Sequence, residues 1–233
     1  MADFIISIDQ GTTSSRAILF NLKGKPVFIS QKEFTQYFPK NGWVEHNPEE
    51  IWNTVKKTLK DAISKAKKLK GKVLAIGITN QRETTVLWNK TNGKPVYNAI
   101  VWQDRRQEEF CKKLRKKNKE NLIFKKTGLL IDSYFSGTKI KWILDNVPSS
   151  RKLMSKKHLL FGTIDSFLIW RLTKGKVHAT DATNASRTMI YNISKNKWDD
   201  RIIKILGIKK HILPEVKDSA DNYGATHPSI IGK

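Results

Sequence analysis

Hydrophobic positions near the start of the chain come in short runs that predict strands. Residues 4–8 read as a buried strand, and residues 16–20 and 27–29 as two more. Polar and glycine-containing stretches at 10–14 and 21–25 separate these runs, as turns do. The pattern therefore predicts an antiparallel meander of three strands.

The next stretch changes to a helical period. Asn47 suits the N-cap, Pro48 the first helical position, and Glu50 the third position of a capping box. The apolar stripe that follows consists of Ile51, Trp52, Val55, Leu59, Ala62, Ile63, Ala66 and Leu69. Gly71 is expected to end this helix as a C-terminal cap.

Strands and helices alternate through the rest of the chain. A buried strand is expected at 73–78, and strands at 84–88 and 95–102 are expected to form a hairpin across the turn at 91–93. Further helices are expected at 105–117, 138–146, 163–172 and 199–206. This order predicts an α/β domain with a mixed sheet and helices on its faces.

The charge of the chain is strongly basic. Its 233 residues hold 44 Lys plus Arg against 21 Asp plus Glu, a formal net charge of +23. Such an excess raises the alternative of a basic nucleic-acid-binding module. Most of the cations are Lys, and dense runs such as 65–68 and 112–117 fall on predicted helices between apolar positions. We interpret them as solvated helix faces and expect no specific nucleic-acid partner.

The cysteine count and the apolar runs bear on the compartment. Cys111 is the single cysteine, so no internal disulfide can form, as is usual in a reducing cytoplasm. The N-terminus lacks the basic and apolar regions of a signal peptide. No apolar run approaches the ~20 residues of a membrane helix. We expect a cytoplasmic protein with no membrane partner.

A first candidate site follows the first strand. Asp9 is followed by Gly11, by hydroxyl side chains at 12–15 and by Arg16. Amides and hydroxyls in such a turn can hold phosphate oxygens, Arg16 adds positive charge, and Asp9 can hold Mg²⁺. A hairpin whose hydroxyls bond their own backbone explains the pattern equally well. The stretch is neither a Walker A loop nor GxGxxG.

Two more polar stretches follow predicted strands. Arg82 and Glu83 could donate to and accept from polyol hydroxyls, or form an exposed ion pair in a turn. Trp102 could pack against the carbon face of a small polar ligand, or be part of the core. No HExxH or CxxC occurs and the five His are scattered, so no metal cluster or nucleophile is indicated.

These stretches, with others between them, resemble a known family. The segments at 9–16, 42–46, 77–85, 97–103, 133–139, 160–165 and 183–189 are similar, in order, to those of the glycerol kinases, within the FGGY family of carbohydrate kinases. The resemblance implies a ribonuclease-H-like, actin-like lobe. It also implies phosphorylation of glycerol to sn-glycerol 3-phosphate, with MgATP as the phosphoryl donor.

The resemblance also implies roles for single residues. Nucleotide phosphate would be bound by Thr12, Thr13, Ser14 and Arg16, and Mg²⁺ by Asp9. Glycerol would be bound by Thr12, Arg82, Glu83, Trp102 and Tyr134. In phosphoryl transfer a protein mainly positions the substrates and neutralises charge on the phosphate oxygens, and these residue types can do both.

One family motif is missing from the sequence. A Gly-Asp-Gln segment, whose Asp is the family's general base, does not occur, so no catalytic residue is expected in this chain. We interpret residues 1–233 as an FGGY-type N-terminal domain without the second lobe, and we expect no turnover by it alone. A kinase for another polyol or sugar is the alternative, and a homo-oligomer of the intact enzyme stays open.

Overall fold

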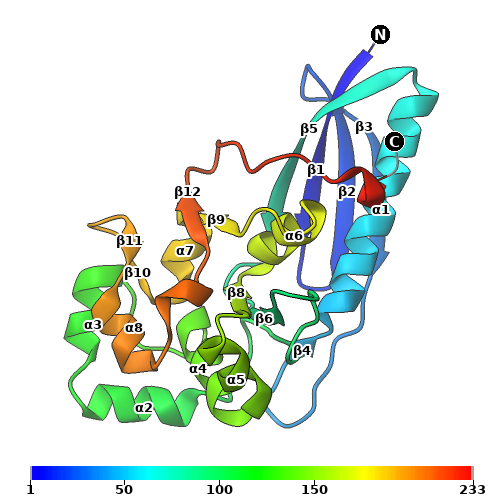
Figure 1. Cartoon of the computed structure of the whole chain (residues 1–233). Coiled ribbons are helices and arrows are strands. Elements are labelled where there is room, and N and C mark those ends of the chain that lie inside the picture. Colours follow the sequence, from blue (N-terminus) through cyan, green and yellow to red (C-terminus); the bar gives the residue numbers. More distant parts are fainter. Residues whose placement is uncertain (1, 232–233) are drawn as a thin grey trace.

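The computed structural model describes residues 2–231, and its largest sheet has four strands at one end of the molecule (Figure 1). Its strands are β1 (Ala2–Gln10), β2 (Ser14–Asn21), β3 (Pro26–Glu33) and β5 (Gly71–Asn80), in the order β3-β2-β1-β5. The first three are antiparallel neighbours, so the expected meander is confirmed. Because β5 runs parallel to β1, the sheet is mixed, also as expected.

Helix α1 (Pro48–Lys68) covers one face of this sheet. The alternation of β1 explains why only one face is covered. Phe4, Ile6 and Ile8 are buried and point to the α1 side, whereas Ile5 between them is exposed. This in–out pattern is typical of a sheet with one face on the core and one facing solvent.

Two details of the α1 ends differ from expectation. Asn47 is the N-cap and accepts a hydrogen bond from the Glu49 N–H, but the capping box is wrong. The Glu50 carboxylate accepts from the Thr35 N–H and the Tyr37 hydroxyl instead, because the preceding loop lies within its reach. The glycine cap is also wrong, since the helix ends at Lys68 and Gly71 is the first residue of β5.

The remaining strands are short and form two-stranded pairs. These pairs are β4 (Glu45–His46) with β7 (Ala99–Ile100), β6 (Val86–Asn89) with β8 (Leu159–Gly162), β9 (Ala179–Asp181) with β12 (Glu215–Lys217), and β10 (Tyr191–Asn192) with β11 (Lys197–Trp198). The expected 84–88/95–102 hairpin is confirmed in part. Gly93 forms the turn, with φ +72°, and the two runs pair antiparallel through the Trp88–Pro95 and Thr85–Ile100 bridges. Only Ala99–Ile100 of the second run forms a strand, and that strand also pairs with β4.

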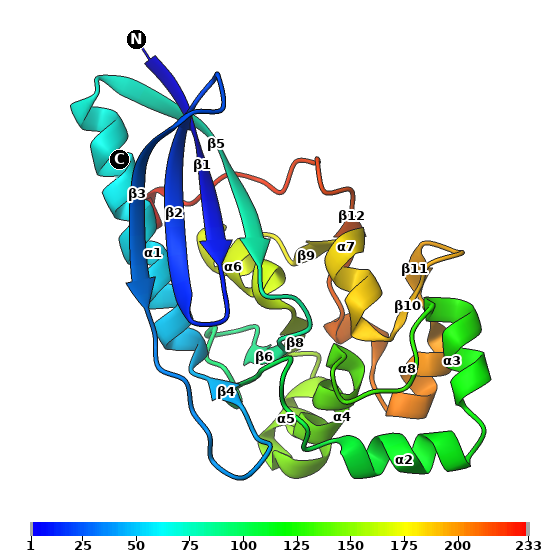
Figure 2. The same cartoon turned by 180° about the vertical axis from the view of Figure 1, so that it is seen from behind.

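The remaining helices lie mostly around these pairs, except that α9 lies against α1 (Figure 2). They are α2 (Glu108–Lys116), α3 (Glu120–Thr127), α4 (Ser136–Asn146), α5 (Pro148–Ser155), α6 (Ile164–Leu172), α7 (Ala182–Ala185), α8 (Asp200–Leu206) and α9 (Pro228–Ile231), with 3-10 turns η1 (Ser186–Thr188) and η2 (Lys210–Ile212). The four expected helices exist as α2, α4, α6 and α8; α2 is shorter than expected, and α4 begins two residues earlier than expected. No pattern had predicted α3 or α5.

Two hydrophobic clusters form the core, and β6 separates them. Val86 and Trp88 pack with the sheet, α1 and α6, whereas Leu87 between them packs with the helices of the second cluster. Neighbouring residues of a strand face opposite sides, so one short strand serves both clusters. The candidate site residues that follow β1 and β5 lie near this junction, where the chain passes from one cluster to the other.

The helix surfaces agree with the interpretation of the lysine runs. Lys67, Lys68, Lys112 and Lys113 are all exposed, on α1 and α2, beside buried apolar neighbours. Among residues 2–231, none of the helices combines the length and the apolar composition that crossing a bilayer requires.

Candidate active site

The site is built where two parallel strands end side by side. Gln10 at the end of β1 is paired in register with Asn80 at the end of β5. The next residue, Gln81, donates its backbone N–H to the Gln10 carbonyl at 2.7 Å, and its side-chain amide donates to the Gly11 carbonyl at 3.1 Å. This buried glutamine therefore fixes the β1–β2 turn against the end of β5.

The β1–β2 turn presents polar groups to solvent. It is closed by a hydrogen bond from the Gly11 N–H to the Ser14 carbonyl at 2.9 Å. Within the described part of the chain, the backbone N–H groups of Thr12 and Thr13 donate to no protein acceptor. Ser15 points the other way, into the core, where it bonds Thr54 at 2.8 Å. The free amides and hydroxyls of the turn suit phosphate oxygens.

Arg16, on β2, lies beside the Asp9 carboxylate on the neighbouring strand β1. It is paired in register with Asp9 on β1 and with Gln31 on β3. Its guanidinium is 3.6 Å from the Asp9 carboxylate, and Nε donates to Gln31 at 3.2 Å. Both charged side chains are 39% exposed, so this ion pair is loose and solvated.

Glu83 lies in a very different environment. Its side chain is only 3% exposed, and its carboxylate accepts a 2.6 Å hydrogen bond from Arg187 Nε. The Ser136 hydroxyl donates to the Glu83 carbonyl at 2.9 Å. Glu83 also has φ +63°, a left-handed conformation that is strained for a residue with a side chain and recurs at functional sites. Several contacts thus hold one carboxylate in a fixed position.

Two aromatic rings, of Trp102 and Tyr134, connect the surroundings of Glu83 to the β1–β2 turn. The Trp102 indole N–H donates to the Thr12 hydroxyl at 3.1 Å, and the Trp102 ring meets the Tyr134 ring edge to face at 5.6 Å. The Arg187 guanidinium lies 5.7 Å from the Tyr134 ring centre. The structure therefore brings Thr12, Glu83, Trp102 and Tyr134 together through direct contacts, with Arg187 between Glu83 and Tyr134.

Arg82 stands apart from this cluster. Its side chain is exposed and makes no hydrogen bond or ion pair within residues 2–231. It lines a polar groove of about 650 Å³ beside the end of β5, together with Asp181 and Asn184. The exposed Arg82–Glu83 ion pair considered from the sequence does not form, since Glu83 pairs with Arg187 instead.

The buried His46 contacts two glutamines, Gln36 and Gln81, that bond the β1–β2 turn. One ring nitrogen of His46 lies 2.6 Å from the Gln36 side-chain oxygen, and the other lies 3.3 Å from the Gln81 amide nitrogen. Gln36 in turn donates to the Thr12 carbonyl at 3.0 Å. Burial lowers the pKa of His46 to about 4, so the ring is neutral and can both donate to Gln36 and accept from Gln81.

The metal ligand suggested by the sequence is a single carboxylate. Within residues 2–231 no group of three or more His, Cys, Asp or Glu side chains is placed to hold a metal ion. Asp9 faces the same open side of the turn as Arg16. Mg²⁺ is commonly held by one or two carboxylates while water and substrate phosphates fill its other positions, so Asp9 alone suits that kind of site.

Sequence reasoning missed Arg187 and Ser136, which hold Glu83. Both lie in segments, 183–189 and 133–139, that carry the family resemblance. That signal marks the segments but does not say which side chain reaches Glu83, 104 and 53 positions away in the chain.

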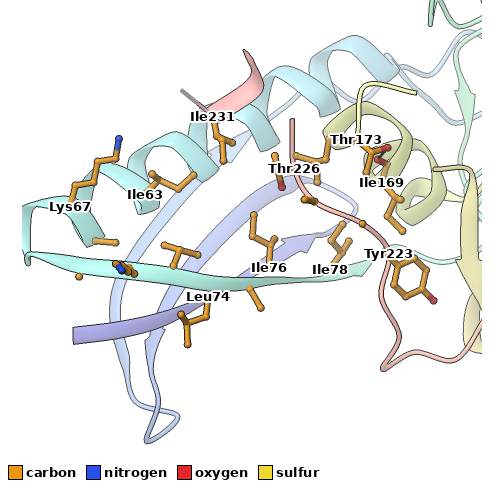
Figure 3. A pocket seen from close by; sticks show the side chains of 18 residues that line it. Ile63, Lys67, Leu74, Ile76, Ile78, Ile169, Thr173, Tyr223, Thr226 and Ile231 are labelled. Carbon is orange, nitrogen blue, oxygen red and sulfur yellow. Dashed lines mark hydrogen bonds between the residues drawn. The ribbon is translucent and has the colours of Figure 1, made fainter. Parts of the chain in front are cut away.

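An apolar groove of the described residues does not coincide with this cluster. It runs along β5 between α1, α6 and the C-terminal segment, with a volume of about 610 Å³ (Figure 3). Ile63 lines it from α1, Ile76 and Ile78 from β5, Ile169 from α6 and Ile231 from α9. Because few polar groups converge there, we assign the chemistry to the cluster at the strand ends.

Known proteins with similar sequences are glycerol kinases. The chain is 57% identical over 232 residues to glycerol kinase of Rhizobium meliloti (strain 1021) and 56% identical to that of Petrotoga mobilis. Each alignment covers 100% of this chain and 47% of the relative. The chain therefore spans about half the length of these relatives.

Solved structures agree with this finding. A crystal structure of Plasmodium falciparum glycerol kinase with ADP matches 99% of this chain and 46% of its own, with 38% identity and a TM-score of 0.94. Gluconate kinase from Lactobacillus acidophilus, at 24% identity and a TM-score of 0.87, shows a likeness of fold alone. The model of the N-terminal domain of FGGY carbohydrate kinases matches residues 4–233. The chain belongs to the FGGY family of carbohydrate kinases and contains the family's N-terminal domain.

Proposed function

We propose that this chain is the glycerol- and phosphate-binding part of an enzyme that transfers the γ-phosphoryl group of ATP to glycerol. The observation that carries the proposal is the buried Glu83 carboxylate, fixed by Arg187 beside the Trp102 and Tyr134 rings. A small polyol needs fixed acceptors and donors for its hydroxyls and an apolar wall for its carbons. The high identity to proteins named glycerol kinase supports the same substrate.

Each side chain of the cluster has a definite part in binding glycerol. Glu83 accepts a hydrogen bond from one hydroxyl, and the Tyr134 phenol donates to or accepts from another. Trp102 packs against the carbon chain, and its bond to Thr12 holds the ring in place. Arg82 lies outside the cluster, but its side chain makes no hydrogen bond or ion pair within the described residues, which leaves its guanidinium available to donate to a glycerol oxygen.

The β1–β2 turn binds the nucleotide phosphates in this proposal. The free amides of Thr12 and Thr13, the Ser14 hydroxyl and the Arg16 guanidinium are the donors. Asp9 holds Mg²⁺, which neutralises charge on the phosphate oxygens when it is bound. Thr12 contacts Trp102 as well, so it connects the phosphate side to the glycerol side.

The general base comes from outside this chain in this proposal. Glu83, the carboxylate nearest the proposed glycerol, is already paired with Arg187 and serves to position the substrate. We place the base in the half of the enzyme that corresponds to the unmatched part of the relatives. The 233-residue chain then binds glycerol but does not turn it over. A cytoplasmic location suits both the ATP requirement and the free, buried Cys111.

A complementation experiment tests this function. The chain is joined to the unmatched half of the Rhizobium meliloti relative, and ADP release is measured with glycerol, xylulose or gluconate. We expect glycerol-dependent ADP release by the fusion and none by the chain alone. A fusion carrying Glu83→Ala is the matched control and should be inactive. Faster turnover of xylulose or gluconate than of glycerol would reject the substrate assignment.

A further inference from the structure

Lys139, on α4, is a buried amine that the proposed function has not used. Its side chain is among the largest in the protein to be fully buried, with 1% of the residue exposed. It forms no ion pair within residues 2–231. Instead, Nζ donates to the Ser133 carbonyl at 2.9 Å and to the Tyr134 carbonyl. Both of its bonds therefore go to the loop that presents Tyr134.

Burying such a group is unfavourable unless its hydrogen bonds are satisfied. Desolvation lowers the pKa of Lys139 to about 7, and the charges of Asp104, Glu83 and Asp132 only partly oppose this effect. A protonated amine has three N–H donors and a neutral one has two. Either form can thus bond both carbonyls, and the contact with the loop does not depend on the charge of the amine.

The same loop is held from its other side. The Asp132 carboxylate accepts the Tyr134 N–H at 2.7 Å, while Lys139 bonds the Tyr134 carbonyl. The peptide groups on both sides of Tyr134 are therefore fixed by side chains. Two residues after Tyr134, the Ser136 hydroxyl donates to the Glu83 carbonyl at 2.9 Å. The segment from 132 to 139 thus fixes two of the residues that surround the proposed glycerol.

We propose that Lys139 is a positioning residue of the polyol site, which holds the Tyr134 phenol at its place beside Trp102 by bonding two consecutive backbone carbonyls. Its effect on glycerol rests on the proposed function, but its effect on the Tyr134 ring does not. Lys139 itself does not need to touch glycerol. The ligand class that this arrangement suits is a small, neutral polyol, because the group that Lys139 fixes is a phenol and not a charged side chain.

The test compares the fully buried Lys139 with a partly buried lysine, Lys126. Lys139→Met keeps the length of the side chain and removes the donors. Lys126→Met, the matched control, removes a partly buried lysine that pairs with Asp199 and does not contact Tyr134. For each chain we measure the melting temperature, the nuclear Overhauser effects between the Trp102 and Tyr134 rings, and the glycerol dissociation constant by calorimetry.

We expect Lys139→Met to lose the Trp102–Tyr134 ring contacts and to weaken glycerol binding by about tenfold, since a displaced phenol forfeits one hydrogen bond and some packing. Lys126→Met should lower the melting temperature but keep both the ring contacts and the affinity. If Lys139→Met fails to fold, Lys139→Gln, which retains an uncharged N–H donor, should show a smaller shift of the same kind.

Two results have distinct meanings. In the first, Lys139→Met keeps the Trp102–Tyr134 ring contacts and its glycerol dissociation constant stays within twofold of the unmodified chain. This result overturns the role of Lys139 and leaves the proposed function standing. Lys139→Gln takes the place of Lys139→Met if only that variant folds. An unmodified chain that binds no glycerol overturns the proposed function, while the ring contacts still decide whether Lys139 positions Tyr134.

Discussion

The two sides of the candidate site are built in opposite ways. On the phosphate side, Arg16 and Asp9 lie 3.6 Å apart and are each 39% exposed. On the polyol side, Arg187 and Glu83 are 2.6 Å apart, and Glu83 is 3% exposed. Both pairs join an arginine to an acid. In the first pair both side chains are open to solvent, whereas in the second the acid is buried beside Ser136 and only the arginine is partly exposed, at 28%.

This difference follows from what each side must bind. A polyol is neutral and flexible, so its affinity depends on groups that are already ordered before it arrives. Phosphates carry a high charge and attract exposed cations at a distance, so a mobile, solvated arginine can serve them. The comparison predicts that changes on the polyol side act on both stability and glycerol, whereas changes on the phosphate side act on nucleotide alone.

The largest effect is expected from Glu83→Ala. It removes a buried acceptor and leaves the Arg187 guanidinium without its carboxylate. We expect glycerol affinity to fall by about 100-fold, the loss of roughly 3 kcal/mol of charge-assisted hydrogen bonding. Calorimetric titration of the chain with glycerol measures the change.

Glu109→Ala is the control for that experiment. Glu109 also pairs with a base, Lys112, but its side chain is 77% exposed. Surface pairs of this kind contribute little, so glycerol affinity should not change. Equal effects of the two substitutions would contradict the assignment of Glu83 to the site.

Acid is expected to destabilise the fold through the histidine behind the turn. Burial lowers the pKa of both His46 and His178 to about 4, below the ordinary value near 6.5, and raises the pKa of Asp165 to about 6. Between pH 6 and 4 the unfolded chain thus binds two more protons through the histidines and one fewer through Asp165. Stability should fall by about 1.4 kcal/mol per pH unit as the pH is lowered.

Urea unfolding at pH 6.0, 5.0 and 4.5 measures this slope. His46→Gln removes one of the two histidine contributions, so the remaining one and that of Asp165 should nearly cancel. The variant is therefore expected to be less stable at pH 6 and to have a nearly flat profile between pH 6 and 5, above the range in which carboxylates with a lowered pKa, such as Glu50, Asp181 and Asp199, bind protons in the unfolded chain. An unchanged slope in His46→Gln would show that His46 is not neutral in the folded protein.

The local sequence pattern was sufficient to predict those elements that depend on neighbouring residues alone. The β1–β3 meander and the Asn47 cap of α1 follow from alternation and from single residues. The hairpin expected across 91–93 forms in part, through the Trp88–Pro95 and Thr85–Ile100 bridges. The pattern did not predict that Ala99–Ile100 also pairs with β4, because a run of apolar residues does not specify a partner far away in sequence.

The residues of the candidate site also fall into those that the sequence predicted and those that it did not. Family resemblance identified Thr12, Glu83, Trp102 and Tyr134. The fold brings the first and the last two into direct contact and links Glu83 to Tyr134 through Arg187. It gave no role to Arg187, because an arginine near a 3-10 turn has no local feature that connects it to Glu83. Such contacts depend on the packing of the two core clusters, which no short window of sequence encodes.

An intermediate effect is expected from Thr12→Val, at the contact between the two sides. The substitution keeps the shape of Thr12 and removes the acceptor of the Trp102 indole N–H. The loss of one neutral hydrogen bond, about 1 kcal/mol, should weaken glycerol binding about fivefold. Thr13→Val is the control, because the exposed Thr13 side chain has no partner within the described residues and should leave glycerol affinity unchanged.

The smallest effect on the free chain is expected from Arg16→Ala, which tests the open side most directly. The loose Arg16–Asp9 pair should contribute less than about 0.5 kcal/mol to stability, so the melting temperature should stay the same. Glycerol affinity should also be unchanged, because Arg16 does not contact Glu83, Trp102 or Tyr134. Nucleotide affinity of the active fusion should fall by about tenfold and depend less steeply on salt, since one cation is lost. If Arg16→Ala lowered glycerol affinity as much as nucleotide affinity, the two sides would be one coupled unit, and the separation drawn from their exposure would be wrong.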